Sequence, residues 1–302
     1  MIGGRSVLHP GHVVVVGSGN LDIVMALERL PRPGETILGD RMEEVAGGKG
    51  LNQAIAAARH ATSAFVGCIG IDAAGTLLKQ RLEGAGVDTE YLVRGVEPTG
   101  RAFIQVTPDG ENNIVVVSLA NSRLDADHVV GALDVLRPAV VLTQLEIPFR
   151  VVEATAEWTE SKGAIFVLNP SPIIELPRSL LERCDPLILN AAEAESILGT
   201  GSAHVPRSSN DVSAEDVAAR LAELVRSVVV TDGSHGAYVG TGHGGIRKIA
   251  GKQVVAVDTT GAGDEFAGVL AAGLARGVDL EHAAQMANES AARLVQVRRS
   301  ER

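Results

Sequence analysis

The sequence has few aromatic residues and few cysteines. Only 3% of its 302 residues are Phe, Trp or Tyr, so the core has to be built from aliphatic side chains. Strands rich in Val, Ile and Leu, covered by helices on both faces, meet that need. The two cysteines, Cys68 and Cys184, have no CxxC spacing, which gives no support to a disulfide framework or a structural zinc site. We expect both to be buried thiols.

Long apolar runs are also missing. Runs such as those at residues 13–16 and 139–142 are a handful of residues long, far short of the roughly 20 residues that a membrane-spanning helix needs. The first twelve residues lack the apolar stretch of a secretory signal. We therefore expect a protein of the cytoplasm that has no membrane partner.

Positive charge is in short supply. The chain has 27 Lys and Arg residues against 37 Asp and Glu residues, which gives a formal net charge of −10 at pH 7. This balance argues against a nucleic-acid partner, since such proteins carry basic surfaces. With 45% hydrophobic and 21% charged residues, the composition is typical of a globular protein. The length suits a single α/β domain over residues 1–302.

The most regular feature is a short aliphatic run that ends in polar residues and is followed by a helical pattern. It occurs at residues 12–16, 139–142, 164–168, 186–189, 228–230 and 253–257. Continuous apolar character predicts strands buried on both faces, and the helices between them predict right-handed crossovers in a doubly wound, mostly parallel sheet. The polar residues after the strands then gather at one edge, where ligands of such sheets bind.

Two stretches break this pattern by alternating apolar and polar residues. They lie at residues 35–46 and 99–119, and the second contains the turn signal Pro-Asp-Gly at 108–110. We expect antiparallel strands, inserted at about 34–46 and 97–119, that form a small sheet as a lid over the polar edge. The exposed face of this lid would suit a homodimer interface. The Gly- and Ser-rich segment 199–213 predicts a surface loop, with Ser213 capping a helix over 214–226.

The motif DTTGAGDEF begins at Asp258. Apolar residues at 266, 269, 270 and 274 fall on one helical face, so a helix is expected to begin near Asp264. Gly261, Ala262 and Gly263 form a small-residue turn before it, whose backbone N–H groups could bind a phosphoryl anion. Asp264 is then either a functional carboxylate or an acidic residue that stabilises the helix start, and spacing alone leaves both open.

A second glycine-rich motif, GGKGLNQA, covers residues 47–54. Its glycines permit close backbone approach, and the helix after it is expected to begin near Leu51 with Asn52 in the first turn. Lys49 lies between glycines and no Ser or Thr follows it, so this is not a Walker A loop. The alternative is a tight strand-to-helix turn in which Lys49 is a solvated charge.

The segment GSGNLD at 17–22 follows the first apolar run. A dinucleotide-binding loop would need a third glycine where Asp22 stands, and a carboxylate there repels pyrophosphate. Asn20 and Asp22 instead supply the donors and acceptors that suit sugar hydroxyls.

Together, GGKGLNQA and DTTGAGDEF resemble the paired signatures of the ribokinase-like carbohydrate kinases, the phosphofructokinase B type. Their order and separation agree with the family from about Val13 to Val297. The resemblance extends to QLE at 144–146, NPSP at 169–172, NAAEAE at 190–195 and TDGSHG at 231–236. It implies the family's α/β fold with a β-sheet lid and ATP-dependent phosphorylation of a sugar's primary hydroxyl. The first expected substrate is D-ribose, with ribose 5-phosphate as product.

The resemblance also implies a role for each matching residue. To the sugar it gives Asn20, Leu21, Asp22, Gly48, Lys49, Gly50, Leu51, Asn52 and Glu146. To ATP it gives Asn190, Thr231, Asp232, Gly233, Ser234, His235, Gly236, Gly263 and Asn288. Asp264 becomes the catalytic base, and Gly261, Ala262 and Gly263 stabilise the phosphoryl group. Glu193 would organise Mg²⁺ through water, and Asp258 and Thr260 would bind a monovalent cation such as K⁺.

The sequence departs from the family pattern at two places. Arg299 stands where the family has Gly, and the family's closing strand and helix do not follow it, which weighs against activation by K⁺. Leu119 replaces a usual Gly shortly before Asn121.

Several alternatives stay open at this point. The chain could be another carbohydrate or nucleoside kinase of the same family, or a non-catalytic sensor of sugar or nucleotide. Glu193 and Glu195 could simply begin a solvated helix. An NAD-dependent oxidoreductase is disfavoured by Asp22.

Overall fold

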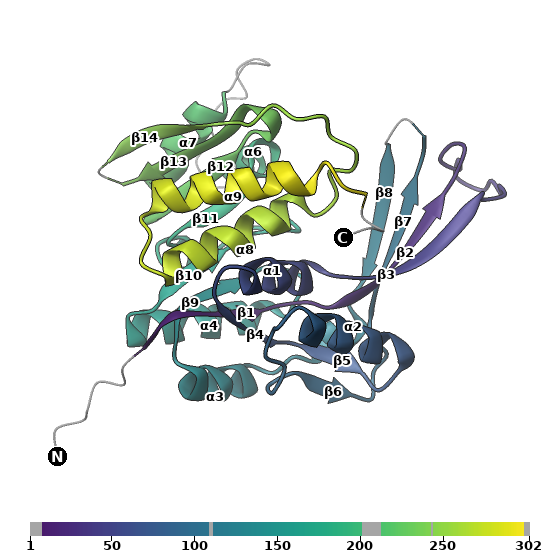
Figure 1. Cartoon of the computed structure of the whole chain (residues 1–302), viewed down its shortest axis with the longest axis horizontal. Helices are drawn as coiled ribbons and strands as arrows, with labels where there is room; N and C mark the ends of the chain where they lie inside the picture. The colour runs from purple at the N-terminus through teal and green to yellow at the C-terminus, as the bar shows by residue number, and fades with distance from the viewer. Residues whose placement is uncertain (1–7, 109–110, 201–212, 243, 299–302) are drawn as a thin grey trace.

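A computed structural model of the chain describes residues 8–108, 111–200, 213–242 and 244–298 (Figure 1). Within these residues, eight strands form the central sheet in the order β14-β13-β12-β11-β10-β9-β1-β4. In chain order they are β1 (His9–Val16), β4 (Thr62–Val66), β9 (Pro138–Thr143), β10 (Ile165–Leu168), β11 (Leu187–Asn190), β12 (Ser227–Thr231), β13 (Gly236–Thr241) and β14 (Gly245–Ala250). The strands from β4 to β12 in this order are parallel, whereas β13 and β14 form an antiparallel edge.

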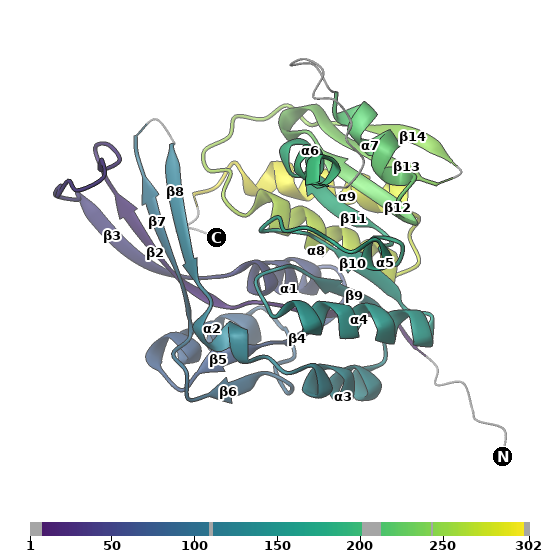
Figure 2. The ribbon, with the colours of Figure 1, turned by 180° about the vertical axis from the view of Figure 1, so that it is seen from behind.

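Helices cover both faces of this sheet (Figures 1 and 2). One face carries α1 (Lys49–Ala58), α2 (Ala73–Gly84), α8 (Ala262–Ala275) and α9 (Leu280–Leu294). The other carries α3 (Ala126–Leu136), α4 (Phe149–Lys162), α5 (Arg178–Leu181), α6 (Ala191–Thr200) and α7 (Ala214–Ala222). Successive valines of β1 alternate between the two cores: Val13 packs under α1 and α8, and Val14 packs under α3 and α4. The predicted doubly wound α/β fold is confirmed.

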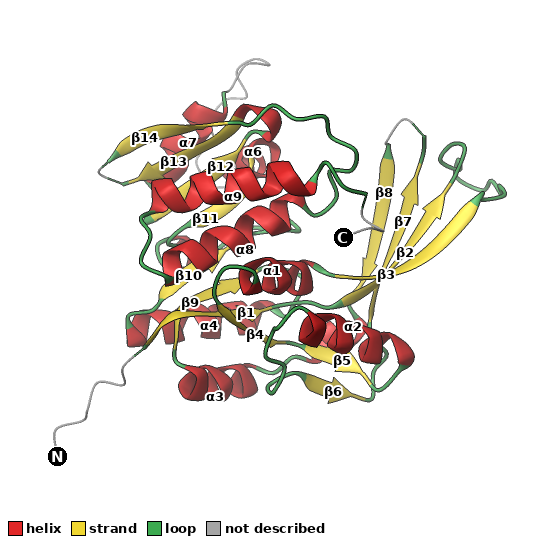
Figure 3. Cartoon of the chain, in the orientation of Figure 1, coloured by secondary structure: helices red, strands yellow, loops and turns green. Residues whose placement is uncertain are grey.

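A second sheet projects from the body beside the central sheet (Figure 3). It contains β2 (Asn20–Ala26), β3 (Arg41–Gly47), β7 (Gly100–Val106) and β8 (Asn112–Val117) in the order β3-β2-β7-β8. We call it the lid sheet. β7 and β8 lie inside the alternating stretch 99–119, but β3 begins only at Arg41, so residues 35–40 are not a strand. The sequence interpretation missed β2, which follows β1 after three residues and carries buried polar side chains that hide its pattern.

The smaller elements complete the described fold. They are β5 (Cys68–Gly70) paired with β6 (Val93–Gly95), and the 3₁₀ helices η1 (Leu119–Arg123) and η2 (Gly233–His235). Cys68 and Cys184 are both buried free thiols, as expected. Among the described residues, no helix has the length and apolar character to cross a membrane.

The predicted strand at 253–257 is wrong. These residues form no strand, and Val255 is 83% exposed. The segment is held instead at the end of α9, because the backbone N–H groups of Val257 and Asp258 donate to the carbonyl of Val295 at 2.7 and 3.1 Å. The two edges of the central sheet are β4 and β14, so residues 253–257 are not part of it. An aliphatic run is therefore not sufficient to predict a buried strand.

The predicted loop and helix near residue 213 are partly as expected. The Ser213 side chain accepts from the backbone N–H of Asp216 and caps α7, but α7 ends at Ala222 rather than near 226. Gly199 and Thr200 belong to α6. Residues 201–212 and the turn positions 109–110 lie outside the described residues.

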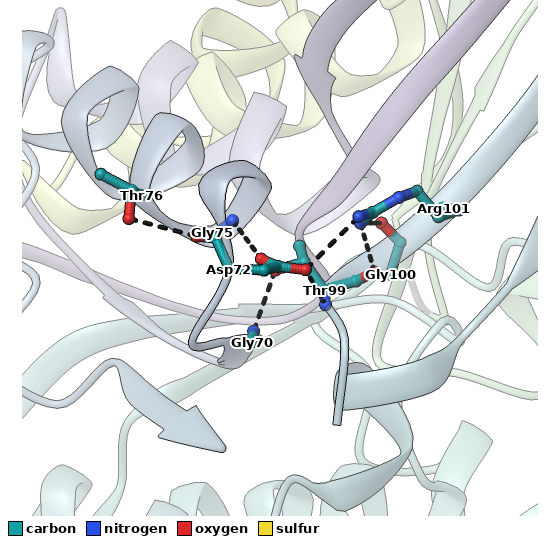
Figure 4. Close-up of polar contacts among 7 residues, drawn as sticks. All are labelled: Gly70, Asp72, Gly75, Thr76, Thr99, Gly100 and Arg101. Atoms are coloured by element: carbon teal, nitrogen blue, oxygen red, sulfur yellow. Dashed lines mark hydrogen bonds and ion pairs between the residues drawn. The ribbon is translucent and has the colours of Figure 1, made fainter. Parts of the chain in front are cut away.

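One carboxylate ties the base of the lid sheet to α2 (Figure 4). Asp72 Oδ1 caps α2 by accepting from Gly75 N at 2.7 Å, and it also accepts from Thr99 Oγ1 at 2.5 Å. Asp72 Oδ2 accepts from Thr99 N at 3.0 Å and from Arg101 Nη2 at 3.3 Å. Burial opposes ionisation of Asp72, but these hydrogen bonds outweigh it and lower its pKa to about 2. Asp72 thus joins α2 to the first residues of β7.

Replacing Asp72 with Asn tests this junction. Asn still caps a helix, but the variant loses the ion pair with Arg101 and weakens the bonds to Thr99. We expect Asp72→Asn to lower the free energy of unfolding at neutral pH by about 1–2 kcal/mol in urea titrations. Since folding lowers this pKa, the contribution is present above the unfolded value of about 4 and is lost as the pH falls towards 2. The difference between the two proteins should shrink over that window.

Asp125→Asn is the matched control for this measurement. Asp125 caps α3 by accepting from the backbone N–H groups of Asp127 and His128. Because Asn is an equally good cap, Asp125→Asn should cost little. Equal losses in the two variants would contradict a special role for Asp72 at the lid sheet.

Candidate active site

The glycines of GGKG bring the start of α1 against the loop between β1 and β2. Gly48 has a φ of 94°, and a Cβ atom there would lie 2.7 Å from the backbone nitrogen of Asn20. A Cβ at Gly50 would lie 2.6 Å from the nitrogen of Ser18. Only glycine permits both approaches. The glycine motif therefore allows a close backbone contact between the start of α1 and the loop after β1. This contact fixes the positions of the side chains that follow in α1 and in β2.

A polar cluster forms around Glu146, which follows β9. Glu146 Oε2 accepts from Ser18 Oγ at 2.5 Å, from Asn20 Nδ2 at 3.3 Å and from the backbone N–H of Lys49 at 3.4 Å. Burial raises the pKa of Glu146, and the hydrogen bond from Ser18 only partly opposes this. Asp22 lies two residues after Asn20 on the same face of β2 and is buried. Segments far apart in the chain thus place Asn20, Asp22, Lys49 and Glu146 in one region.

Leu21 and Leu51 do not join this cluster through their side chains. Leu21 points to the opposite face of β2 from Asn20, because side chains alternate along a strand. Leu51 packs in the apolar core between α1 and the sheet, while its backbone N–H donates to the carbonyl of Ser18 at 2.9 Å. Leu21 and Leu51 thus support the site by packing and through their backbone, whereas Gly48 and Gly50 support it through their backbone alone.

Asp264 is the third residue of α8, and its carboxylate faces α1. Asp264 Oδ2 accepts from Asn52 Nδ2 at 3.0 Å, and Oδ1 accepts from Gln53 Nε2 at 3.1 Å. Both of these bonds come from a different helix, which favours a site carboxylate over a residue that only stabilises the start of its own helix. The residue is buried.

The turn before Asp264 is open on one side. Gly261 has a φ of 78°, which favours glycine, and it is the N-cap residue of α8. A Cβ atom at Gly261 or Gly263 would meet nothing within 4 Å. The first N–H groups of a helix have no partner within the helix and attract anions. Gly261 and Gly263 therefore offer room and backbone donors for a phosphoryl group next to Asp264. Ala262 does not offer its N–H in this structure, because that group donates to the carbonyl of Thr259 at 3.1 Å.

The residues predicted to bind the nucleotide lie near the ends of β11 and β12. Asn190 and Thr231 are neighbours at the ends of β11 and β12. The turn after β12 is closed by a hydrogen bond from Asp232 N to Gly236 O at 2.8 Å, and it exposes Gly233, Ser234 and His235. Gly236 has a φ of 106° and a carbonyl 2.0 Å from where a Cβ would stand, so only glycine fits. On α9, Asn288 Nδ2 donates to Ala250 O at 2.8 Å.

The predicted metal residues form no dense ligand cluster. Glu193 Oε2 accepts from the backbone N–H of Asn190, and Asn190 Oδ1 accepts from that of Glu193, both at 2.9 Å. These two hydrogen bonds lie at the start of α6, the position that the alternative interpretation of Glu193 gave it. Asp258 Oδ1 accepts from Thr260 N at 2.9 Å. In the described parts of the chain, no three His, Cys, Asp or Glu side chains are grouped to hold a metal ion.

Sequence reasoning missed the side chains that orient the site. They are Ser18, Gln53, Asn121, Gln144 and Asn169. Asn121 is buried; it accepts from Gly19 N at 3.0 Å and donates to Asn20 Oδ1 at 2.8 Å. Leu119 at the start of η1 has a φ of 42°, a left-handed backbone conformation that favours glycine. Polar residues directly after buried strands were the available signal for Gln144 and Asn169.

The raised pKa of Glu146 predicts that this carboxylate opposes folding when it is ionised. A carboxyl whose pKa is raised on folding stabilises the protein while protonated, and that contribution is lost as the pH rises through the folded pKa. The neutral, isosteric Glu146→Gln should therefore have a higher Tm than the original protein at about pH 8, with a smaller gap near the ordinary glutamate pKa of about 4. Differential scanning calorimetry across this range measures the gap.

Glu160→Gln controls for removal of a charge as such. The side-chain hydrogen bond from Arg183 lowers the pKa of Glu160, so its neutralisation should not raise Tm. If Glu146→Gln is no more stable than the original protein at the higher pH, the electrostatic account of this cluster is wrong.

Comparisons with known proteins agree with this arrangement. The model of the pfkB family carbohydrate kinases matches residues 11–301. The ribokinase of Staphylococcus aureus is 34% identical over 290 residues, covering 94% of this chain and 93% of that protein. The ribokinase of Haemophilus influenzae is 37% identical over 265 residues, covering 85% and 83%.

Solved structures agree at the level of the fold. The structure of Arabidopsis thaliana ribokinase complexed with ribose and ATP matches with a TM-score of 0.82 at 31% identity, covering 96% of this chain and 94% of that one. Ribokinase from Thermotoga maritima matches with a TM-score of 0.83 at 31% identity, covering 94% and 93%. By sequence and by structure, this chain belongs to the pfkB family of carbohydrate kinases.

Proposed function

We propose that the chain is an ATP-dependent ribokinase that phosphorylates the primary hydroxyl of D-ribose to give ribose 5-phosphate. The observation that carries the proposal is the position of Asp264: a buried carboxylate, held by Asn52 and Gln53, directly after an open glycine turn at a helix N-terminus. A base beside a phosphoryl-binding turn is the arrangement that phosphoryl transfer to an alcohol needs. The similarity to ribokinases over most of the chain supports the choice of sugar.

The sugar would bind between the lid sheet and the start of α1. Asn20, Asp22, Asn52 and Glu146 offer amide donors and carboxylate acceptors, which together match the mixed character of sugar hydroxyls. Gly48 lets the backbone approach closely, and Lys49 lies next to Glu146. Asn20 is held by Glu146 and Asn52 by Asp264, so little ordering of these amides is left for the sugar to impose.

In the proposed reaction, Asp264 accepts the proton of the primary hydroxyl while that oxygen attacks the γ-phosphorus of ATP. The bond between the γ-phosphorus and its bridging oxygen breaks, and ADP leaves. Backbone N–H groups of Gly261 and Gly263 would stabilise the charge on the equatorial oxygens. The protein's contribution is thus position and local electrostatics.

ATP would lie along the ends of β11 and β12. Its binding residues would be Asn190, the turn 231–236 and Asn288, with its phosphates towards Gly263. Bound Mg²⁺ would neutralise phosphate charge, and its ligands would come mostly from ATP and water. Glu193 is half-buried, and its Oε2 accepts from the backbone N–H of Asn190, which suits an indirect role through water. The expectation about K⁺ stays a prediction, since Arg299, on which it depends, lies outside the described residues.

Lid closure over the sugar would exclude water and so limit wasteful ATP hydrolysis.

The lid sheet also presents an unusual edge, because four consecutive apolar residues of β8, Ile114 to Val117, are between 41% and 55% exposed. We propose that this strand contributes to a homodimer interface. We further propose that the protein works in the cytoplasm.

Asp264→Asn tests the catalytic part of this proposal. The substitution keeps the shape of the side chain but removes the proton acceptor, so kcat for ribose should fall by about a thousandfold or more. Binding of ribose and of a non-hydrolysable ATP analogue should remain within a few-fold by calorimetry. Asp127→Asn, on the opposite helical layer, is the control and should keep full turnover.

A panel of acceptors tests the substrate. Ribose should be phosphorylated with a higher kcat/KM than fructose, 2-keto-3-deoxygluconate or adenosine. A better acceptor among these would replace ribose while leaving the kinase assignment intact. If the original protein binds ATP and sugar but transfers no phosphoryl group to any acceptor, the chain is a sensor and the proposed enzyme function is wrong.

Charge placed on β8 tests the dimer. Val115→Lys should convert the protein to a monomer in light scattering after size-exclusion chromatography, because a buried lysine at an apolar interface is not tolerated. Val135→Lys is the matched control, since Val135 is 63% exposed on α3, away from the lid sheet. A monomeric original protein, or a Val115→Lys variant that stays dimeric, would overturn this interface.

A further inference from the structure

Three buried amide side chains lie beneath Asp264. They are Gln53 in α1, Gln144 directly after β9 and Asn169 directly after β10. Burial of an amide is unfavourable unless its groups are paired, and apolar side chains would fill the same space more cheaply. Three such residues, converging from separate elements on one carboxylate, therefore call for an explanation beyond packing.

Their hydrogen bonds run in one direction. Asn169 Nδ2 donates to the carbonyl of Ile188 at 3.0 Å, which turns the Asn169 oxygen towards Gln53. Gln53 Nε2 donates to that oxygen and to Asp264 Oδ1, both at 3.1 Å. Gln144 Nε2 then donates to Gln53 Oε1 at 2.5 Å. Because the Ile188 carbonyl can only accept, the network fixes which end of the Gln53 amide faces Asp264.

The cost of this arrangement falls on Gln144. Its Oε1 atom is buried and finds no hydrogen-bond partner among the residues that the structure describes. A Cβ atom at Gly17 would come within 2.2 Å of the same oxygen, so the backbone there closes over it. An unpaired buried carbonyl oxygen lowers stability. The arrangement thus favours the orientation of Gln53 over the stability of the fold.

We propose that Gln53 is a positioning residue for Asp264, oriented in turn by Gln144 and Asn169. This inference rests on the proposed function, in which Asp264 is the base. The bond from Gln53 occupies Oδ1, and Asn52 takes one lone pair of Oδ2. A second lone pair of Oδ2 then remains for the proton of the sugar hydroxyl. Fixing the carboxylate in advance spares the reaction the cost of orienting it.

Gln53→Met and Gln144→Met test this role, since Met matches the length of Gln without its amide. For Gln53→Met we expect kcat to fall by about 10- to 100-fold, with the KM values for ribose and ATP within about threefold of the original. For Gln144→Met we expect a smaller fall in kcat, about 3- to 10-fold, because Gln53 itself remains. The same Gln144→Met variant removes the unpaired Gln144 oxygen but also takes the donor away from Gln53 Oε1, so its Tm should stay close to that of the original protein.

A merely structural network predicts a different pattern. In that case kcat, KM and Tm would deteriorate together, and Gln144→Met would be the less stable protein. Thr155→Val serves as the control for deletion of a buried polar group, because Thr155 Oγ1 donates only within α4, to Val151 O at 2.7 Å. It should leave kcat unchanged.

Parallel assays separate this inference from the proposed function. If the original protein phosphorylates no acceptor, the proposed function fails. If Asp264→Asn keeps most of its turnover, Asp264 is not the base, and the inference about Gln53 fails with it. If Asp264→Asn is inactive while Gln53→Met stays within twofold of the original kcat, only the inference about Gln53 is overturned. If Gln53→Met does not fold, an unchanged kcat in Gln144→Met also overturns the inference about Gln53. If the original protein shows no turnover, a crystal structure of Gln53→Met tests the positioning role of Gln53 instead. A rotated Asp264 carboxylate supports this role, and an unmoved carboxylate contradicts it.

Discussion

The site depends on one close contact between two glycine-rich segments, residues 17–20 and 47–50. Their backbones approach so closely that a Cβ atom at Gly48 or Gly50 would overlap the opposite chain. One side of this contact leads into β2, which carries Asn20 and Asp22 towards the lid sheet. The other side leads into α1, whose first turns carry the amides that hold Asp264. The same contact therefore sets the position of the proposed sugar ligands relative to the proposed base.

Local dipoles resolve an electrostatic problem that the composition raises. A chain with a formal net charge of −10 is proposed to bind a polyanionic nucleotide. No overall positive field is needed where backbone N–H groups at the start of α8 and a bound Mg²⁺ receive the phosphates. Near the sugar, Glu146 accepts from Ser18 Oγ and Asn20 Nδ2, and Asp264 accepts from the amides of Asn52 and Gln53. Burial nevertheless raises the pKa of Glu146, so this part of the site gives up stability for binding groups.

The sequence predicted those parts of the structure that short segments determine. Aliphatic runs buried on both faces identified β1, β9, β10, β11 and β12, and the two glycine motifs identified the loops of the candidate site. It failed where burial depends on distant partners: residues 253–257 look like a core strand, yet they are held at the end of α9. Gln53 and Asp264 are 211 positions apart, so their hydrogen bond left no local pattern. At Leu119 the sequence showed only a departure from the family, and the left-handed backbone supplied its physical meaning.

The central claim is that Asp264 takes a proton from the primary hydroxyl of ribose beside the turn 261–263. A crystal structure with ribose and a non-hydrolysable ATP analogue tests it most directly. The account predicts that the 5-hydroxyl oxygen lies about 3 Å from Asp264 Oδ2 and in line with the γ-phosphorus, with the γ-phosphate oxygens at the N–H groups of the turn. A ribose that presents another hydroxyl to Asp264, or a γ-phosphate bound away from this turn, would contradict it.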